Sequence, residues 1–162
     1  MKKFLSYAIP FVILASWYYF RYHVAPEIDD EAIQVYNEQG ALVPVSSLQN
    51  GPVLLNFYAA WCGHCMQEME ALERAHQRKQ FTVIGLTDDE PGKIDQVRAR
   101  FNLTFPIYQL EHPIKDYDVH SLPTSYLLNA EGQVVQSLIG PKDWDSDAFM
   151  NKVASWLSKE GS

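Results

Sequence analysis

The stretch FYAAWCGHCMQEME, residues 57–70, contains both cysteines of this 162-residue chain, Cys62 and Cys65. An apolar run over residues 53–59 leads into it and predicts a buried strand. A helical pattern follows, from Cys62 to about Lys79. Cys62 therefore lies at the expected N-terminus of a helix, where unpaired N–H groups and the helix dipole favour a thiolate. Cys65 lies one turn further on the same face, within disulfide reach and less exposed.

Three roles are open to two cysteines at this spacing: a redox pair, part of a zinc site, or a structural staple. A zinc site needs three or four ligands, and none of the four candidate histidines lies at zinc-finger spacing. Those histidines are His64, His76, His112 and His120. A disulfide within one helical turn closes a small loop and adds little stability. The pattern favours a pair that cycles between dithiol and disulfide, and it predicts no metal.

In the redox interpretation Cys62 is the nucleophile and Cys65 resolves the mixed disulfide with a partner. Gly63 lets a partner chain approach closely. His64 hydrogen-bonds to the Cys62 thiolate or favours it electrostatically when protonated.

The rest of the chain predicts an α/β domain with a mixed central sheet flanked by helices. Parallel βαβ units are followed by an antiparallel strand pair and a closing helix, which gives the mixed sheet. A hairpin with its turn at residues 37–40 precedes them. Further strands are predicted at 81–87, at 105–110 and twice within 124–140, and helices at 91–101 and 143–159. In the last helix, Trp144, Phe149 and Val153 are expected to face the core.

The N-terminus has a different composition from the rest. Lys2 and Lys3 precede an uncharged, largely apolar run from Phe4 to Phe20, and seventeen helical residues span roughly 25 Å, slightly less than a bilayer core. A good cleavage site is missing, and the aromatic cluster of residues 17–22 resembles an interfacial belt. We therefore expect a retained signal-anchor transmembrane helix over residues 1–24, with the N-terminus inside. A linker over 25–31 and one domain over 32–162 complete the expected organisation.

The formal net charge is −7, and all 20 acidic residues lie at or after Glu27, together with 10 of the 13 basic ones. Binding of nucleic acid needs a basic surface. The acidic balance of the domain therefore argues against a nucleic-acid partner.

Two longer stretches carry a resemblance to a known family: VYNEQGALVPVSSLQNGPVLLNFYAAWCGHC, residues 35–65, and SLPTSYLLNAEGQVV, residues 121–135. The chain resembles the thioredoxin superfamily, and more narrowly the membrane-anchored TlpA/ResA-like thiol–disulfide oxidoreductases of bacteria, over about residues 33–157. The resemblance implies a thioredoxin-like fold with an N-terminal β-hairpin extension.

The resemblance also assigns residues to the site. Pro123 matches the superfamily's cis-proline beside the nucleophile, which leaves the Leu122 backbone to pair with an extended partner segment, the alternative being an ordinary trans proline in a loop. Glu68 matches an active-site glutamate that takes the proton from Cys65, the alternative being a solvated helix glutamate. Trp61 matches the tryptophan that flanks the nucleophile, with packing as its alternative role.

Two departures from the superfamily concern proton transfer and the direction of electron flow. Asn56 stands in place of the buried aspartate of ordinary thioredoxins and cannot act as a base, which leaves proton transfer to Glu68. The inner dipeptide Gly63–His64 is that of protein disulfide isomerase rather than that of reductive relatives.

The resemblance implies a protein-disulfide reductase without a bound cofactor. It would be fed by a membrane electron donor and act on exported protein substrates, for example in cytochrome c maturation. The expected location is the bacterial inner (cytoplasmic) membrane, with the domain in the periplasm or on the outer face. The alternatives are an exported disulfide oxidase or isomerase, and a thioredoxin-fold binding module with incidental redox activity. A peroxidase is a weaker alternative, because the first cysteine is not in that family's setting.

Overall fold

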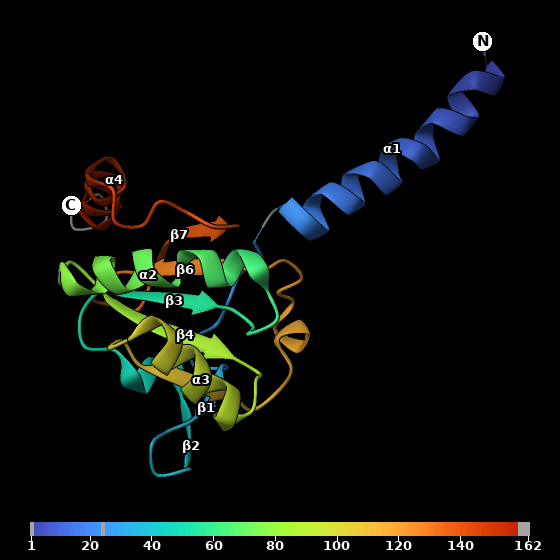
Figure 1. Cartoon of the computed structure of the whole chain (residues 1–162). Helices are drawn as coiled ribbons and strands as arrows, with labels where there is room; N and C mark the ends of the chain where they lie inside the picture. Colours follow the sequence, from blue (N-terminus) through green and yellow to red (C-terminus); the bar gives the residue numbers. More distant parts are fainter. Residues whose placement is uncertain (1, 24, 159–162) are drawn as a thin grey trace.

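A seven-stranded mixed sheet forms the centre of the domain, with strand order β2-β1-β5-β4-β3-β6-β7 (Figure 1). The computed structural model describes residues 2–23 and 25–158. The strands are β1 (Gln34–Tyr36), β2 (Leu42–Pro44), β3 (Val53–Phe57), β4 (Thr82–Thr87), β5 (Ile107–Leu110), β6 (Thr124–Leu128) and β7 (Val134–Ile139). β3, β4 and β5 run parallel, whereas β6 pairs antiparallel with β3, and β1 with β5. The predicted mixed sheet and hairpin extension are confirmed.

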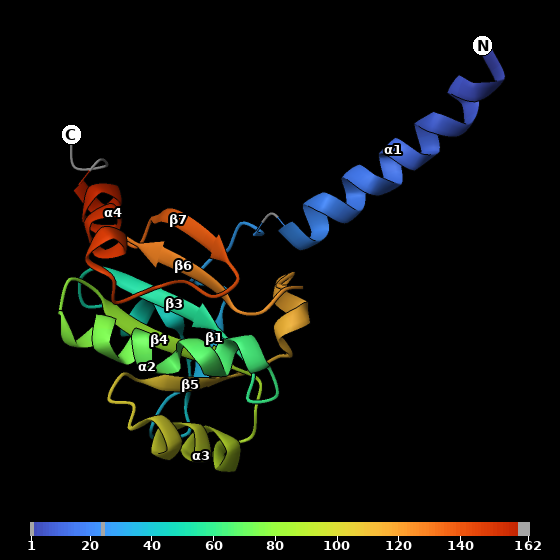
Figure 2. The ribbon, with the colours of Figure 1, turned by 45° about the horizontal axis from the view of Figure 1, so that its top comes forward.

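All α-helices except the N-terminal one cover one face of this sheet, and shorter segments cover the other. The helices are α1 (Lys2–His23), α2 (Gly63–Gln77), α3 (Pro91–Phe101) and α4 (Asp147–Ser158), with 3-10 helices η1 (Val45–Leu48) and η2 (Ile114–Tyr117). Buried residues of α2, α3 and α4 form one apolar cluster with the sheet. A second cluster joins the opposite face to β1, η1 and η2. Figure 2 shows α2 and α3 lying over the sheet, with α4 beside β7.

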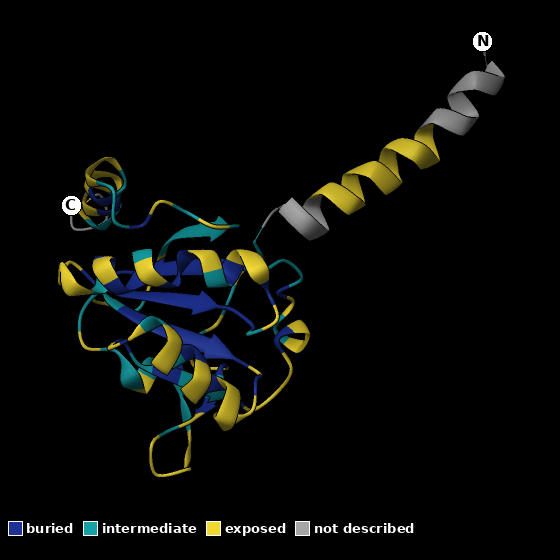
Figure 3. Cartoon of the chain, viewed as in Figure 1, coloured by how far each residue is buried: buried dark blue, intermediate teal, exposed yellow. Residues whose placement is uncertain are grey.

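β3 lies inside the sheet between β4 and β6, and every residue in it is buried (Figure 3). Its one polar residue, Asn56, is paired with Gly85 on β4 and Ser125 on β6. A Cβ at Gly85 would lie 3.0 Å from Ile107 Cγ1, so this position accommodates a larger side chain only if neighbours shift. The chain leaves the carboxyl end of β3 and enters α2 through the cysteines.

The last helix starts later than the sequence predicted. It begins at Asp147 instead of residue 143, because the Ser146 hydroxyl accepts the Phe149 N–H at 3.2 Å, as an N-cap residue does. Trp144 is buried as expected, but it lies in the loop before the helix rather than on its inner face. The two 3-10 helices were not predicted either.

α1 occupies the position of the predicted anchor and extends away from the domain (Figures 1 and 2). Its large apolar side chains between Ile9 and Tyr19 are exposed. None of the helices in the described part of the chain combines the length and apolarity required to cross a membrane, so the predicted transmembrane helix is not shown. Met1 and Val24, both within the predicted anchor, lie outside the described residues.

The segment predicted as a linker, residues 25–31, makes contacts with the domain. The Pro26 carbonyl accepts a hydrogen bond from Tyr126 Oη at 2.9 Å, and Ile28 packs against the second apolar cluster. Asp30 accepts one from Gln49 Nε2 at 2.6 Å.

Candidate active site

The two cysteines lie at the point where the β3–α2 loop becomes helix. Cys62 is the N-cap residue of α2, with extended backbone, and its Sγ accepts the Cys65 N–H at 3.2 Å. Its own N–H donates to the Ala59 carbonyl at 3.0 Å, which turns the chain from the strand into the helix. The predicted position of the first cysteine at a helix N-terminus is confirmed.

Cys62 and Cys65 form a disulfide, with their Cα atoms 5.2 Å apart. Cys62 keeps 7% of its surface exposed, whereas Cys65 is completely buried. Trp61 projects into solvent, with 78% of its surface exposed, and Gly63 and His64 are exposed as well. An incoming sulfur atom therefore has access to Cys62 but not to Cys65.

A cavity of about 670 Å³ opens beside Cys62. Its walls come from the active-site loop with Trp61 and His64, from η2 with Ile114, and from the segment that ends at Leu122. More of its wall is apolar than polar. It brings together five residues that the sequence analysis assigned to the site, Trp61, Cys62, Gly63, His64 and Leu122, from two separate stretches of the chain.

Pro123 follows this segment, and the Leu122–Pro123 peptide bond is cis, as the resemblance implied. Pro123 is buried, and its carbonyl accepts the Gly140 N–H at 2.8 Å. β6 begins at the next residue and runs antiparallel to β3. The pairing of these strands sets the Leu122 segment beside the end of β3 that carries Cys62.

Glu68 lies one helical turn after Cys65 and is buried, with 2% of its surface exposed. Its Oε1 accepts from Asn56 Nδ2 at 3.1 Å. Its Oε2 accepts from Trp144 Nε1 at 2.7 Å and from the Lys142 N–H at 3.3 Å. Burial raises the pKa of the Glu68 carboxyl, although these three donors and the charge of Lys142 act in the opposite direction. A solvated helix glutamate, the alternative considered above, does not fit this burial.

Two aspartates that the sequence analysis did not single out hold the walls of the site. The buried Asp89 accepts the Ala60 N–H at 2.6 Å, just ahead of Trp61. Asp88 accepts the Ile114 N–H at 3.1 Å and so attaches η2. Both follow β4 directly. Their position at the carboxyl end of a buried strand next to the active-site strand could have identified them from the sequence.

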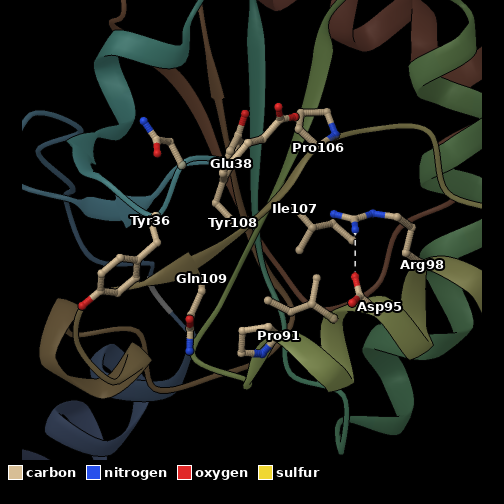
Figure 4. A pocket seen from close by; sticks show the side chains of 12 residues that line it. Tyr36, Glu38, Pro91, Asp95, Arg98, Pro106, Ile107, Tyr108 and Gln109 are labelled. Atoms are coloured by element: carbon tan, nitrogen blue, oxygen red, sulfur yellow. Dashed lines mark hydrogen bonds and ion pairs between the residues drawn. The ribbon is translucent and has the colours of Figure 1, made fainter.

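A separate cavity of about 560 Å³ lies between α3 and strands β1 and β5 (Figure 4). Tyr36, Tyr108 and Gln109 line it from the strands, and Asp95 and Arg98 from the helix. The two charged groups form an ion pair of 3.1 Å across its wall. Neither cysteine borders this cavity, so we place the thiol chemistry at the cavity beside Cys62.

Comparison with known proteins agrees with this site. The model of the AhpC/TSA family matches residues 23–137, most of the chain. The chain belongs to the AhpC/TSA family. It is 38% identical to the thioredoxin-like protein YneN of Bacillus subtilis over 105 residues, which cover 59% of this chain and 62% of YneN, less than two thirds of that protein. It is 29% identical to the thiol-disulfide oxidoreductase ResA of Bacillus cereus over 158 residues, 92% of this chain and 90% of ResA.

Solved structures agree on the fold. A secreted Mycobacterium tuberculosis disulfide oxidoreductase, described as homologous to DsbE, superposes with a TM-score of 0.60 at 21% identity, over 75% of this chain and 94% of that one. The ResA relatives, the shared fold and the disulfide at the Cys-x-x-Cys position together confirm the resemblance. They also confirm the predicted class of enzyme, a thiol–disulfide oxidoreductase.

Proposed function

We propose that this chain reduces disulfides of exported proteins, with Cys62 as nucleophile and Cys65 as resolving cysteine. The observation that carries the proposal is the asymmetry of the pair. Cys62 is the N-cap of α2, where the helix terminus favours a thiolate, and it keeps 7% of its surface exposed. Cys65 is completely buried one turn behind it.

The exchange then takes place in two steps. The Cys62 thiolate attacks one sulfur of a substrate disulfide, which forms a mixed disulfide and releases the other substrate sulfur as a thiolate. Cys65 loses its proton and attacks Cys62 Sγ, which closes the Cys62–Cys65 disulfide and releases the second substrate thiolate. Two electrons pass from the dithiol to the substrate, and a donor of two electrons must restore the dithiol.

In this mechanism Glu68 accepts the proton of Cys65. The support is its position one turn further along α2, its burial and a pKa raised by that burial, which brings the carboxylate closer to the basicity that proton transfer near neutral pH requires. The proton that the Cys65 thiol loses is gained by the Glu68 carboxylate.

The substrate is an extended polypeptide segment that lies along the cavity beside Cys62. The largely apolar wall supports this proposal, as does the Leu122 segment, which offers backbone groups for strand-like pairing. Trp61 and His64 are exposed at the rim and would contact the segment on either side of its cysteine.

We further propose that residues 1–24 hold the domain at the outer face of a bacterial inner membrane, where a membrane donor supplies electrons. The exposed apolar side chains of α1 support an association with lipid. Cytochrome c maturation is the process we propose for this activity, on the resemblance described above. An oxidase or isomerase is the second candidate, favoured by the Gly63–His64 dipeptide.

The redox potential tests the direction of flow. The full chain is equilibrated in detergent with glutathione or dithiothreitol buffers, and its thiols are trapped. We expect a value at or below about −240 mV, in the range of reductants such as thioredoxin. A value of about −180 to −120 mV, the range of disulfide isomerase and DsbA, would instead identify an oxidase or isomerase. A chain with both cysteines replaced by serine is the control, because only a binding module would keep its function.

A further inference from the structure

A row of three buried polar side chains runs from α2 over the neighbouring strands β3 and β6. Asn56 Nδ2 donates to Glu68 Oε1 at 3.1 Å and to Ser125 Oγ at 2.9 Å. All three residues expose 2% of their surface or less. Asn56 and Ser125 are directly opposite each other on β3 and β6, so the sheet fixes the row.

The two oxygens of Glu68 have partners of different kinds. Oε2 accepts from the Trp144 indole N–H and from the Lys142 backbone N–H. Neither group has an acceptor to offer at that nitrogen. Oε1 faces Asn56, whose side-chain amide carries a donor at one end and an acceptor at the other. Asn56 is therefore the partner that can change from donor to acceptor.

This difference determines where a proton on Glu68 can lie. A proton on Oε2 would point at two N–H groups, and one hydrogen bond there would be lost. A proton on Oε1 points at the Asn56 amide, which becomes an acceptor when it rotates by half a turn and brings Oδ1 into the place of Nδ2. The Ser125 hydroxyl can donate as well as accept, so it follows the reversal by rotating its own proton.

The charge nearest to Glu68 favours its ionised form, so a proton on Glu68 depends on burial and on a hydrogen-bond acceptor. Lys142 is the charged group that acts on Glu68 from the β7–α4 loop, and its Nζ is held by the carbonyls of Ile139 and Gly140 at 2.6 and 3.0 Å. Its charge favours the ionised carboxylate. From α2 the neighbouring sulfur is that of Cys65, which is disulfide-bonded in this structure and does not titrate. From β3 and β6 the facing groups, Asn56 and Ser125, are uncharged.

We propose that Asn56 is a positioning residue whose side-chain amide reverses when Glu68 gains or loses a proton, so that the proton is held on Oε1 and both states of Glu68 are fully hydrogen-bonded. In turnover this proton is the one that Cys65 gives up, and for that origin the inference rests on the proposed function. The amide itself gains and loses no proton. A donor-only partner at this position would hold Glu68 in its ionised form and hinder the transfer.

Nuclear magnetic resonance on the oxidised full-length chain tests the reversal without any thiol chemistry. The Glu68 side-chain carboxyl carbon reports its titration, and NOEs from the Asn56 amide protons to the Ser125 β-protons report the orientation of the amide. We expect these NOEs at high pH and their loss in step with the protonation of Glu68. NOEs that persist through the titration would overturn the proposal.

A Glu68→Gln variant tests the same point independently of pH. Its amide oxygen must face the Trp144 and Lys142 donors, so its NH₂ faces Asn56, and the Asn56 amide should be reversed at every pH. If the Asn56 amide of this variant keeps the orientation that it has beside ionised Glu68, the proposal is wrong. This test also works if Glu68 of the unmodified chain does not titrate in the accessible pH range.

Ser125→Ala is the matched control for the other end of the row. In this variant the orientation of the Asn56 amide is measured by NOEs from its amide protons to the Glu68 γ-protons. The Glu68-dependent reversal should survive in it, because the hydroxyl follows the amide. If Ser125→Ala abolishes the reversal, Ser125 sets the orientation and the proposal is wrong. These spectra are recorded on the disulfide form, so the absence of an amide reversal would not contradict the proposed thiol–disulfide exchange. Conversely, a chain that fails to reduce disulfides could still show the reversal by NMR.

Discussion

Two glutamates on the same helix have opposite properties. Glu68 and Glu73 are five residues apart on α2, and both are buried, with 2% and 6% of their surface exposed. Burial raises the pKa of Glu68, whose hydrogen bonds only partly offset it. At Glu73 burial acts in the same direction, but Thr104 and Gln77 outweigh it and leave the pKa lowered.

Each carboxylate accepts three hydrogen bonds from the groups named below, so the lengths of these bonds and the deeper enclosure of Glu68 explain the difference. Glu73 accepts from the Thr104 hydroxyl at 2.6 Å, the Thr104 N–H at 2.8 Å and Gln77 Nε2 at 2.8 Å. Glu68 has one bond of comparable length, from Trp144, and two longer ones. Glu73 thus fastens the turn before β5 to α2 as a permanent anion, whereas Glu68 remains able to take up a proton. Burial alone therefore does not mark a carboxylate as a proton acceptor.

The largest expected effect is the difference between Glu68→Gln and Glu73→Gln in the rate of disulfide reduction. Loss of a general base typically costs at least about 100-fold in rate. We expect Glu68→Gln to slow reduction of insulin disulfides by the reduced chain by about that factor near pH 6–7. The defect should shrink above about pH 9, where thiols ionise without a base. Glu73→Gln should stay within about twofold of the unmodified chain, and equal losses in both variants would remove the distinction.

A smaller effect is expected for Trp144→Phe, which removes the shortest donor to Glu68. A hydrogen bond to a charged group contributes about 1.5–3 kcal/mol, and its loss disfavours the ionised carboxylate. The pKa of Glu68 should rise further, as measured in a titration of its carboxyl carbon by NMR. Trp156→Phe on α4 is the matched control and should leave the titration unchanged. A lowered pKa in Trp144→Phe would contradict the assigned donor role.

The smallest effect concerns stability and its dependence on pH. A lowered pKa at Glu73 stabilises the fold above the ordinary glutamate value of 4.5, and this stabilisation is lost as pH falls through the folded-state pKa. Glu73→Gln should therefore lower the free energy of unfolding by about 1–3 kcal/mol at pH 7 and by much less at pH 3, measured with urea.

The sign is opposite for Glu68. Its raised pKa means that stability falls as pH rises from 4.5 to the folded-state pKa. Glu68→Gln should remove that decline. A parallel pH dependence in the two variants would show that the two carboxylates are in equivalent environments.

Much of the fold and part of the site could be predicted from local pattern. The order of strands and helices follows from apolar runs and turn residues, and the position of Cys62 follows from a strand that runs directly into a helical pattern. The start of α4 was predicted too early, because three aspartates and Trp144 resemble a helix start, while the cap is formed by the Ser146 hydroxyl. The partners of Glu68 could not be predicted, because Trp144 is 76 residues away in the chain.

The sequence by itself determined the redox pair, the placement of Cys62 at the end of a buried strand, and the acidic character of the domain, because each depends on residues close together in the chain or on composition alone. The tertiary structure decided which of two similar glutamates is poised to exchange a proton. That property depends on which donors the sheet and the β7–α4 loop bring to each carboxylate, and such contacts arise only when distant segments pack together.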